Sequence, residues 1–168
     1  GLSSLGPAVD DHRGFRLPST CLPRRDIDLK KWAVVACDQY TSEPEYWREV
    51  AREVGDAPST LHLVLPEIHL GQPDAAARIR RIQQTMRSYL AQGLLQERHG
   101  AIYVERTLGH RVRRGLMLEL DLEHYDFGSA STSLIRPTEG TIVARLAPRI
   151  EVRREAELEL PHILVLID

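Results

Sequence analysis

The chain has 168 residues, of which 42% are hydrophobic and 27% are charged. Because most domains hold roughly 100 to 200 residues, this length allows one domain with a sizeable core, and the composition excludes a disordered or fibrous protein. The 22 basic and 24 acidic residues are intermixed and give a formal net charge of -2. Such a balance creates no long-range positive field, so nucleic-acid partners are not expected.

Targeting segments and cysteine motifs are absent from the sequence. No apolar run approaches the ~20 residues of a membrane span, and the N-terminus lacks the charged-then-apolar order of a signal peptide. We therefore expect a soluble, cytoplasmic protein without a membrane partner. The two cysteines, Cys21 and Cys37, have no CxxC partner and are predicted to be free thiols.

The first predicted elements lie between residues 1 and 55. Residues 1–30 contain glycines and prolines without sustained periodicity, which predicts an irregular N-terminal arm. The apolar run AVVAC at 33–37 predicts a buried strand. Ser42 and Glu45 have the spacing of a capping box, and the apolar residues that follow at helical spacing predict a helix over 43–54.

A second strand and a long helix are predicted next. The run HLVLP at 62–66 has the length and composition of a strand that is ended by its proline. Pro73 and Asp74 suit the first turn of a helix, and Gly93 suits its end. Between them runs an apolar stripe of Ile79, Ile82, Met86 and Leu90. The arginines on the other face of this helix are expected to be solvated.

The remaining chain completes an α+β pattern. Leu108, Gly109 and His110 are predicted to form the tip of a hairpin, and the leucines that alternate over 116–122 predict a half-buried antiparallel strand. The fold class is therefore α+β, a mixed sheet with packed helices, in a single domain over residues 31–168. The run LPHILVLID at 160–168 stops inside a predicted buried strand, so we expect the domain to be truncated at its C-terminus.

The stretch IRPTEGTIVARLAPR, residues 135–149, has two interpretations. It can be an ordinary helix start, with Thr138 as N-cap and Pro148 as the end. It can also be a phosphate site, because free amides at a helix start attract anions and Gly140 lets a ligand approach. Arg136 and Arg145 would then contact phosphate oxygens. The Glu139 carboxylate would repel a phosphate beside it. It is compatible with a phosphate site only if Mg²⁺ bridges the two groups, or if Glu139 is the base that takes a hydroxyl proton. Spacing alone leaves both interpretations open.

A second candidate position follows the first predicted strand. Cys37, Asp38 and Tyr40 lie at its end, a common location for ligand-binding side chains. Asp38 is expected either to hold Mg²⁺ or a substrate amine, or only to organise the turn with Ser42. Cys37 is predicted to be a buried core residue and not a nucleophile. The seven histidines show no zinc-site spacing, so no structural metal is predicted.

The amino-acid sequences of several segments resemble those of one known family. KWAVVACDQYTSEPEYW, GDAPSTLHLVLPE, IYVERT, STSLIRPTEGTIVARLAPR and ELPHILVLID, in this order, are similar to the N-terminal part of the Domain of Unknown Function 1015 family of bacteria and archaea. The resemblance covers roughly residues 20 to 168. Family members are longer than this chain, and they usually carry alanine at the position of Pro137.

The resemblance implies more about a site than about a reaction. Family members are often encoded near serine-biosynthesis genes, and the family looks distantly related to the ParB/sulfiredoxin fold, which binds nucleotides and includes a kinase of free serine. It implies a nucleotide-binding phosphotransferase acting on a small hydroxylated metabolite, with L-serine as the best guess, ATP or ADP as the phosphoryl donor, and Mg²⁺. The implied catalytic residues are Glu139 and Asp38. The implied phosphate-binding residues are Arg136, Thr138, Gly140, Thr141, Arg145 and Arg149. A non-catalytic module that senses a nucleotide or phosphorylated metabolite is the alternative, and a scaffolding unit is the third hypothesis.

Overall fold

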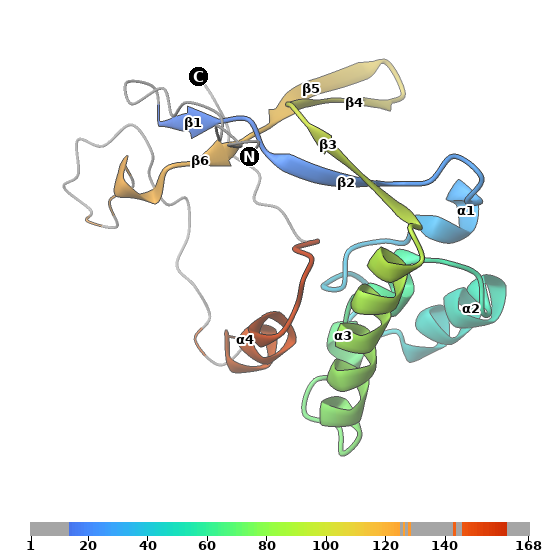
Figure 1. Cartoon of the computed structure of the whole chain (residues 1–168). Helices are drawn as coiled ribbons and strands as arrows, with labels where there is room; N and C mark the ends of the chain where they lie inside the picture. The colour runs from blue at the N-terminus through green and yellow to red at the C-terminus, as the bar shows by residue number, and fades with distance from the viewer. Residues whose placement is uncertain (1–13, 125, 127, 129–142, 144–145, 161–168) are drawn as a thin grey trace, which may run out of the picture. The chain divides into compact units, whose positions relative to one another are not determined.

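Figure 1 shows a computed structural model of the chain, which describes residues 14–124, 126, 128, 143 and 146–160. The chain forms two compact units. The described residues of the first unit are 14–22, 97–124, 126 and 128; those of the second unit are 23–96, 143 and 146–160. Among these residues, no helix is both long and apolar enough to cross a membrane. Helices and antiparallel strand pairs occur together, which confirms the α+β class.

The second unit is built from helices. These are α1 (Leu29–Trp32), α2 (Pro44–Val54), α3 (Ala75–Ala91) and α4 (Leu146–Arg154), with short 3-10 turns η1 (Thr60–Leu63) and η2 (Glu67–His69). The predicted helices at 43–54 and after Asp74 are confirmed, because their apolar residues recur at the helical period and glycines follow their ends. Gly55 and Gly93 both adopt positive φ, of 56° and 63°.

The predicted capping box of α2 does not form. The helix begins at Pro44, so Glu43 occupies the N-cap position and makes no side-chain cap hydrogen bond. Glu45 accepts hydrogen bonds from Arg48 instead of reaching back to a cap. Proline at the first helical position sets the start of the helix here, because its fixed φ suits a helix and its missing N–H needs no partner.

Both strands predicted for this unit are wrong. Residues 33–36 are irregular and Val35 is 36% exposed. In the run at 62–66, His62 and Leu63 end the turn η1 and the next three residues are irregular. Ser59 begins that turn, because its hydroxyl oxygen accepts a hydrogen bond from the Leu61 amide at 3.1 Å. The run after Ser59 is nevertheless buried, with Leu63 2% exposed. A short apolar run indicates burial, but it does not distinguish a strand from other buried structure.

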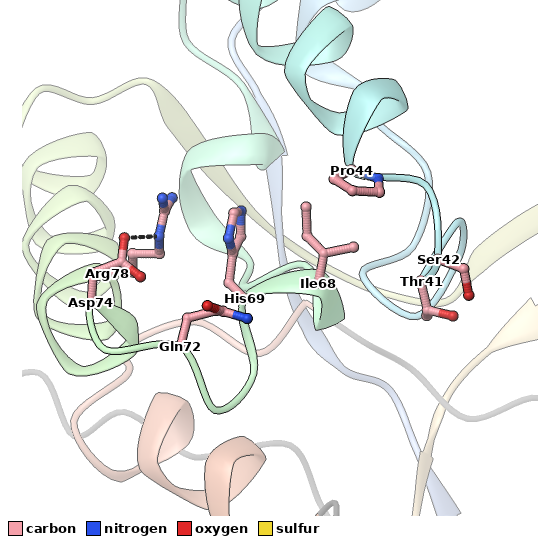
Figure 2. Close-up of a pocket in the computed structure, with 8 residues that line it drawn as sticks. All are labelled: Thr41, Ser42, Pro44, Ile68, His69, Gln72, Asp74 and Arg78. Atoms are coloured by element: carbon pink, nitrogen blue, oxygen red, sulfur yellow. Dashed lines mark hydrogen bonds and ion pairs between the residues drawn. The ribbon is translucent and has the colours of Figure 1, made fainter.

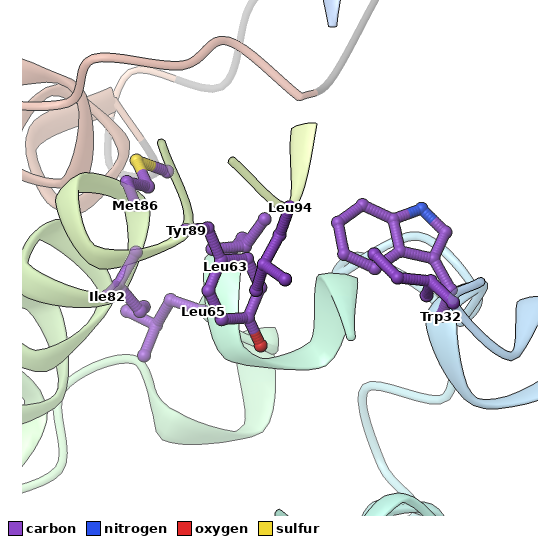
Figure 3. Packing of buried hydrophobic residues seen from close by; sticks show 8 residues of the cluster. Trp32, Leu63, Leu65, Ile82, Met86, Tyr89 and Leu94 are labelled. Atoms are coloured by element: carbon purple, nitrogen blue, oxygen red, sulfur yellow. The ribbon is translucent and has the colours of Figure 1, made fainter. Parts of the chain in front are cut away.

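The core of the second unit lies along α3 (Figure 3). Met86 and Ile82 of α3 pack with Leu63 and Leu65, and Tyr89 lies 6.1 Å from the Trp32 ring, measured between ring centroids. The Tyr89 hydroxyl oxygen accepts a hydrogen bond from the fully buried Ser59 amide at 3.1 Å. The core cluster is Ile27, Trp32, Leu63, Leu65, Ile82, Met86, Tyr89 and Leu94. The apolar face of α3 therefore joins segments that are far apart in the sequence.

The described strands form three pairs and not one mixed sheet. β1 (Phe15–Arg16) pairs antiparallel with β6 (Glu119–Leu120), and β4 (Ile102–Leu108) pairs antiparallel with β5 (Arg111–Met117). β2 (Ser19–Pro23) pairs with β3 (Leu95–His99). Strands β1 and β2 lie within the segment predicted to be an irregular arm, of which residues 1–13 are outside the described residues.

The predicted hairpin is confirmed, but its second strand is shorter than predicted. Gly109 and His110 connect β4 to β5, and Gly109 has a φ of 59°, which suits the first position of a tight hairpin turn. β5 ends at Met117, and β6 pairs with β1 instead of continuing the hairpin. Leu116 is 62% exposed, so the prediction of one half-buried strand over 116–122 is wrong.

The C-terminal predictions are only partly within the described residues. The predicted helix start near Thr138 lies outside them, and of the strand predicted in the run 160–168 only Leu160 is described, where no strand is present. Pro148 was predicted to end a helix, yet it lies in the first turn of α4. Proline is tolerated in a first turn because the amides there have no partner within the helix.

Candidate functional site

The loop that follows α1 lies against η2 in the second unit. The Glu67 amide donates a hydrogen bond of 2.9 Å to the Cys37 carbonyl oxygen. This contact brings the segment with Cys37 and Asp38 beside the side chain of Glu67. Asp38 is exposed, so a ligand can reach its side chain.

The positively charged side chain of this region, Arg149, comes from helix α4. The Arg149 guanidinium forms an ion pair with the Glu67 carboxylate, with 2.5 Å between Nη2 and Oε1. The Glu67 side chain is only 8% exposed, whereas that of Arg149 is 48% exposed. The side-chain amide of Gln83 on α3 donates a 3.2 Å hydrogen bond to the Glu151 carbonyl oxygen, which anchors α4 near Arg149. A half-exposed arginine is thus held by a nearly buried carboxylate.

The pKa shifts link four side chains into one cluster, which we call the Cys37 cluster: Cys37, Asp38, Glu67 and Arg149. Burial raises the pKa of the Cys37 thiol, and the charge of Asp38 raises it further, while Arg149 opposes this and Glu67 adds to it. The pKa of Arg149 is raised mainly by its hydrogen bond to Glu67, with smaller effects of Cys37 and Asp38. The four side chains therefore interact electrostatically. The raised pKa keeps Cys37 a thiol at neutral pH. Cys37 is only half-buried and is not part of the core cluster, so the prediction of a buried core residue is wrong.

The raised pKa of Cys37 predicts slow alkylation. At about pH 8, where an ordinary thiol of pKa ≈ 8.5 is partly ionised, we expect iodoacetamide to modify the exposed Cys21 before Cys37. Because Arg149 lowers the Cys37 pKa, Arg149→Gln should slow the Cys37 reaction further and shift its pH profile upward. Peptide mass spectrometry over a pH series measures both rates. Faster modification of Cys37 than of Cys21 in the folded protein would contradict the arrangement.

The loop after Asp38 has an unusual backbone conformation. Tyr40 has a φ of 51°, the only positive φ of a non-glycine residue within the described ranges. Its ring stacks on that of Tyr46 with centroids 3.9 Å apart, and the Trp47 indole N–H donates to the Gln39 carbonyl oxygen at 3.3 Å. Non-glycine residues with such φ values are held by their surroundings and are common at ligand sites. The two aromatic residues of α2 therefore fix the conformation of the loop.

A second feature is a pocket of about 480 Å³ (Figure 2). Ile68 and His69, which follow Glu67 in η2, contribute to its lining. Its lining comes from the start of α2, from η2 and from the start of α3: Thr41, Ser42, Pro44, Ile68, His69, Gln72, Asp74 and Arg78. Arg78 Nε donates to the Asp74 carboxylate at 2.7 Å. Burial lowers the pKa of His69, and the charge of Arg78 lowers it further, so its imidazole is neutral at pH 7. The pocket therefore offers hydroxyl groups, a neutral imidazole and one ion pair to a small polar ligand.

Two of the predicted site residues come together in the structure. Asp38 and Arg149 both belong to the Cys37 cluster, although the sequence analysis placed them in separate motifs. The other predicted residues, Arg136, Thr138, Glu139, Gly140, Thr141 and Arg145, lie outside the described residues. Their roles stay predictions.

Sequence reasoning missed Glu67, His69 and Arg78. Glu67 pairs with a residue that is 82 positions away, and no motif indicates such a pair. Arg78 was expected on the solvated face of a helix, yet it lines the pocket. Its spacing of four residues from Asp74 is the one local signal, because such helical neighbours form ion pairs.

These features define an α+β protein with a small polar site beside the η2 turn of its second unit. Residues 21–168 match the family described as "Protein of unknown function (DUF1015)", and the chain belongs to this family. The resemblance seen in the sequence is thereby confirmed. No curated protein and no solved structure matches the chain.

Proposed function

We propose that the protein is a cytoplasmic, nucleotide-binding phosphotransferase that acts on a small hydroxylated metabolite, with free L-serine as the best candidate. The observation that carries the proposal is the meeting of two segments at η2: Arg149 pairs with Glu67 at 2.5 Å, and the Glu67 amide donates to the carbonyl oxygen of Cys37, the residue before Asp38. The proposal includes a distant relation to the ParB/sulfiredoxin fold.

The chemistry requires a cation for the phosphates and an acceptor for a proton. The hydroxyl oxygen of the substrate bonds to the transferred phosphorus, the bond to the leaving nucleotide oxygen breaks, and the hydroxyl proton goes to a carboxylate. Arg149 has five N–H donors, and its bond to Glu67 fixes the position of the guanidinium. Asp38 or Glu139 takes the proton, and Arg136 and Arg145 complete the phosphate contacts.

The implied magnesium ion is compatible with the described residues. Among them, no group of three or more His, Cys, Asp or Glu side chains is arranged to hold a metal. Magnesium at phosphotransfer sites needs only one or two carboxylates together with phosphate oxygens and water, and the exposed Asp38 fits this requirement. When bound, the ion would neutralise charge on the phosphates.

The pocket in Figure 2 supports a small zwitterionic substrate. An amino acid carries an ammonium group, which matches the Asp74 carboxylate, and a carboxylate, which matches the Arg78 guanidinium. Thr41 and Ser42, which line the pocket, lie three and four residues after Asp38 in the same loop.

The second candidate is a non-catalytic module that senses a nucleotide or phosphorylated metabolite. One observation favours it: Asp38 is exposed, whereas a catalytic base is held in a fixed position by its surroundings. Such a module would use the same arginines without turnover.

Binding and turnover together distinguish the candidates. Calorimetry and thermal shift with ATP, ADP, pyrophosphate and phosphate, each with and without Mg²⁺ and L-serine, are expected to show Mg²⁺-dependent binding that Arg145→Ala abolishes. A ligand at about 100 times its Kd should stabilise the protein by ~2.7 kcal/mol. A kinase will transfer phosphate to serine, and Asp38→Asn or Glu139→Gln will bind the nucleotide but stop turnover. Binding without turnover in the unmodified protein supports the sensor, and no binding overturns both candidates.

A further inference from the structure

The hairpin of β4 and β5 has two chemically different faces. Its register pairs Glu105 with Arg114 and Arg106 with Arg113. Residues paired across an antiparallel ladder lie on the same face, and successive residues alternate between the faces. Glu105 and Arg114 therefore share one face, and Arg106 and Arg113 share the other.

The first face is balanced in charge. Arg114 Nε lies 3.0 Å from Glu105 Oε2, and the Tyr103 hydroxyl donates to the same carboxylate at 3.1 Å. The pair of Tyr103 and Leu116 continues this face. No further anion is needed here, because the arginine already has a carboxylate partner.

The opposite face carries three arginines, for which the described residues supply no ion pair. We call it the arginine face, and it consists of Val104, Arg106, Leu108, Arg111 and Arg113. All five residues are exposed, and this face of the hairpin contains no carboxylate. Arg106 and Arg113 lie directly opposite each other, an arrangement of like charges that destabilises a ladder unless an anion lies between them. The composition therefore indicates an anionic partner.

An acidic protein segment fits this face better than a nucleic acid. The apolar residues Val104 and Leu108 are 45% and 77% exposed and lie between the arginines. The hairpin's tyrosine lies on the other face, so no aromatic side chain is available there for base stacking. The chain as a whole has a net charge of -2, which gives no long-range attraction for phosphate backbones.

The chain itself contains a segment of the complementary chemistry. In EAELEL, residues 155–160, the glutamates Glu155, Glu157 and Glu159 are exposed, whereas the residues between them are partly buried against the core of the second unit. Glu159 forms an ion pair with Arg153 at 2.6 Å. Glu155 lies in a turn directly after α4 and Glu157 in a bend, so alternate residues of the segment present carboxylates to solvent. The segment and the arginine face are therefore complementary in charge.

We propose that the arginine face of one copy binds the acidic segment 155–159 of a second copy. In a twofold dimer each copy contributes one hairpin and one acidic segment, so the contact occurs twice. The side chains are exposed, so the association is weak and sensitive to salt. This inference is independent of the proposed function.

Neighbouring residues of β5 supply a matched pair of variants. Arg113→Glu and Arg114→Glu make the same charge change on opposite faces of one strand. Sedimentation equilibrium at about 0.05 M and 0.5 M salt is expected to show a dimer only at low salt. The double variant Arg106→Glu/Arg113→Glu should weaken the dimer at least tenfold, and Arg114→Glu should change it less than twofold. Circular dichroism verifies that each variant is folded.

A charge exchange tests whether the contact is between two copies. Glu155→Arg/Glu157→Arg should also fail to form a dimer with itself, but its mixture with Arg106→Glu/Arg113→Glu should give a heterodimer, because each opposed pair again has opposite charges. A monomer at every concentration and salt, equal effects of the Arg113 and Arg114 variants, or no heterodimer in the mixture would each overturn the proposal.

Discussion

Replacing Met86 with alanine is expected to lower the free energy of unfolding by about 2 to 5 kcal/mol. Met86 is 2% exposed and is the largest fully buried side chain within the described residues. Its loss removes apolar contacts with Leu63, Leu65 and Tyr89 and leaves a cavity that close-packed neighbours fill only in part. The core of the second unit is small, so no other cluster compensates for the loss.

Urea denaturation followed by tryptophan fluorescence measures this effect, because Trp32 belongs to the same core. Leu29→Ala on α1 is the control: it also removes an apolar side chain from a helix, but Leu29 is 63% exposed. The control is expected to change the free energy of unfolding by at most about 0.5 kcal/mol. Equal losses in the two variants would show that Met86 is not part of a packed core.

The sequence predicts those elements whose signals are local. Helices α2 and α3 follow from apolar residues at helical spacing and from the glycines after their ends, and the hairpin tip at Gly109 follows from turn chemistry. The strands expected at 33–37 and 62–66 do not form, since a short apolar run carries no period that separates a strand from buried irregular structure. Burial was thus predictable at Leu63, but its conformation was not.

The candidate site, too, could be predicted from the sequence only in part. Asp38 could be proposed because acidic residues at the end of an apolar run often contact ligands, and Arg149 because of its family motif. Glu67 could not be proposed, since its role depends on a partner that is 82 residues away and is brought near by the packing of α4 on α3. The sequence shows which residues are chemically suited to a site, while the neighbours that orient them are set by tertiary packing.

Removing Arg149 is expected to affect stability because it breaks an ion pair whose carboxylate is poorly hydrated. In Arg149→Gln the Glu67 carboxylate, 8% exposed, loses its 2.5 Å contact with the guanidinium. Breaking a fully buried ion pair costs about 3 to 5 kcal/mol. Because Arg149 is 48% exposed and partly screened by water, we expect a smaller loss of about 1 to 3 kcal/mol in the free energy of unfolding. Glu67→Gln should cost less, because a neutral amide in this position requires no balancing charge.

A double-mutant cycle with both substitutions isolates the interaction of the pair, and urea denaturation at about 0.1 M and 1 M salt shows how far it is screened. Arg48→Gln is the control, since Arg48 pairs with Glu45 on the exposed surface of α2, where both side chains are at least 65% exposed. The control should cost at most about 0.5 kcal/mol. If Arg149→Gln costs no more than Arg48→Gln, the Glu67 pair does not hold α4 in place. Nucleotide binding is measured in the same variants. Glu67→Gln keeps Arg149 and should retain phosphate affinity, whereas Arg149→Gln should lose it.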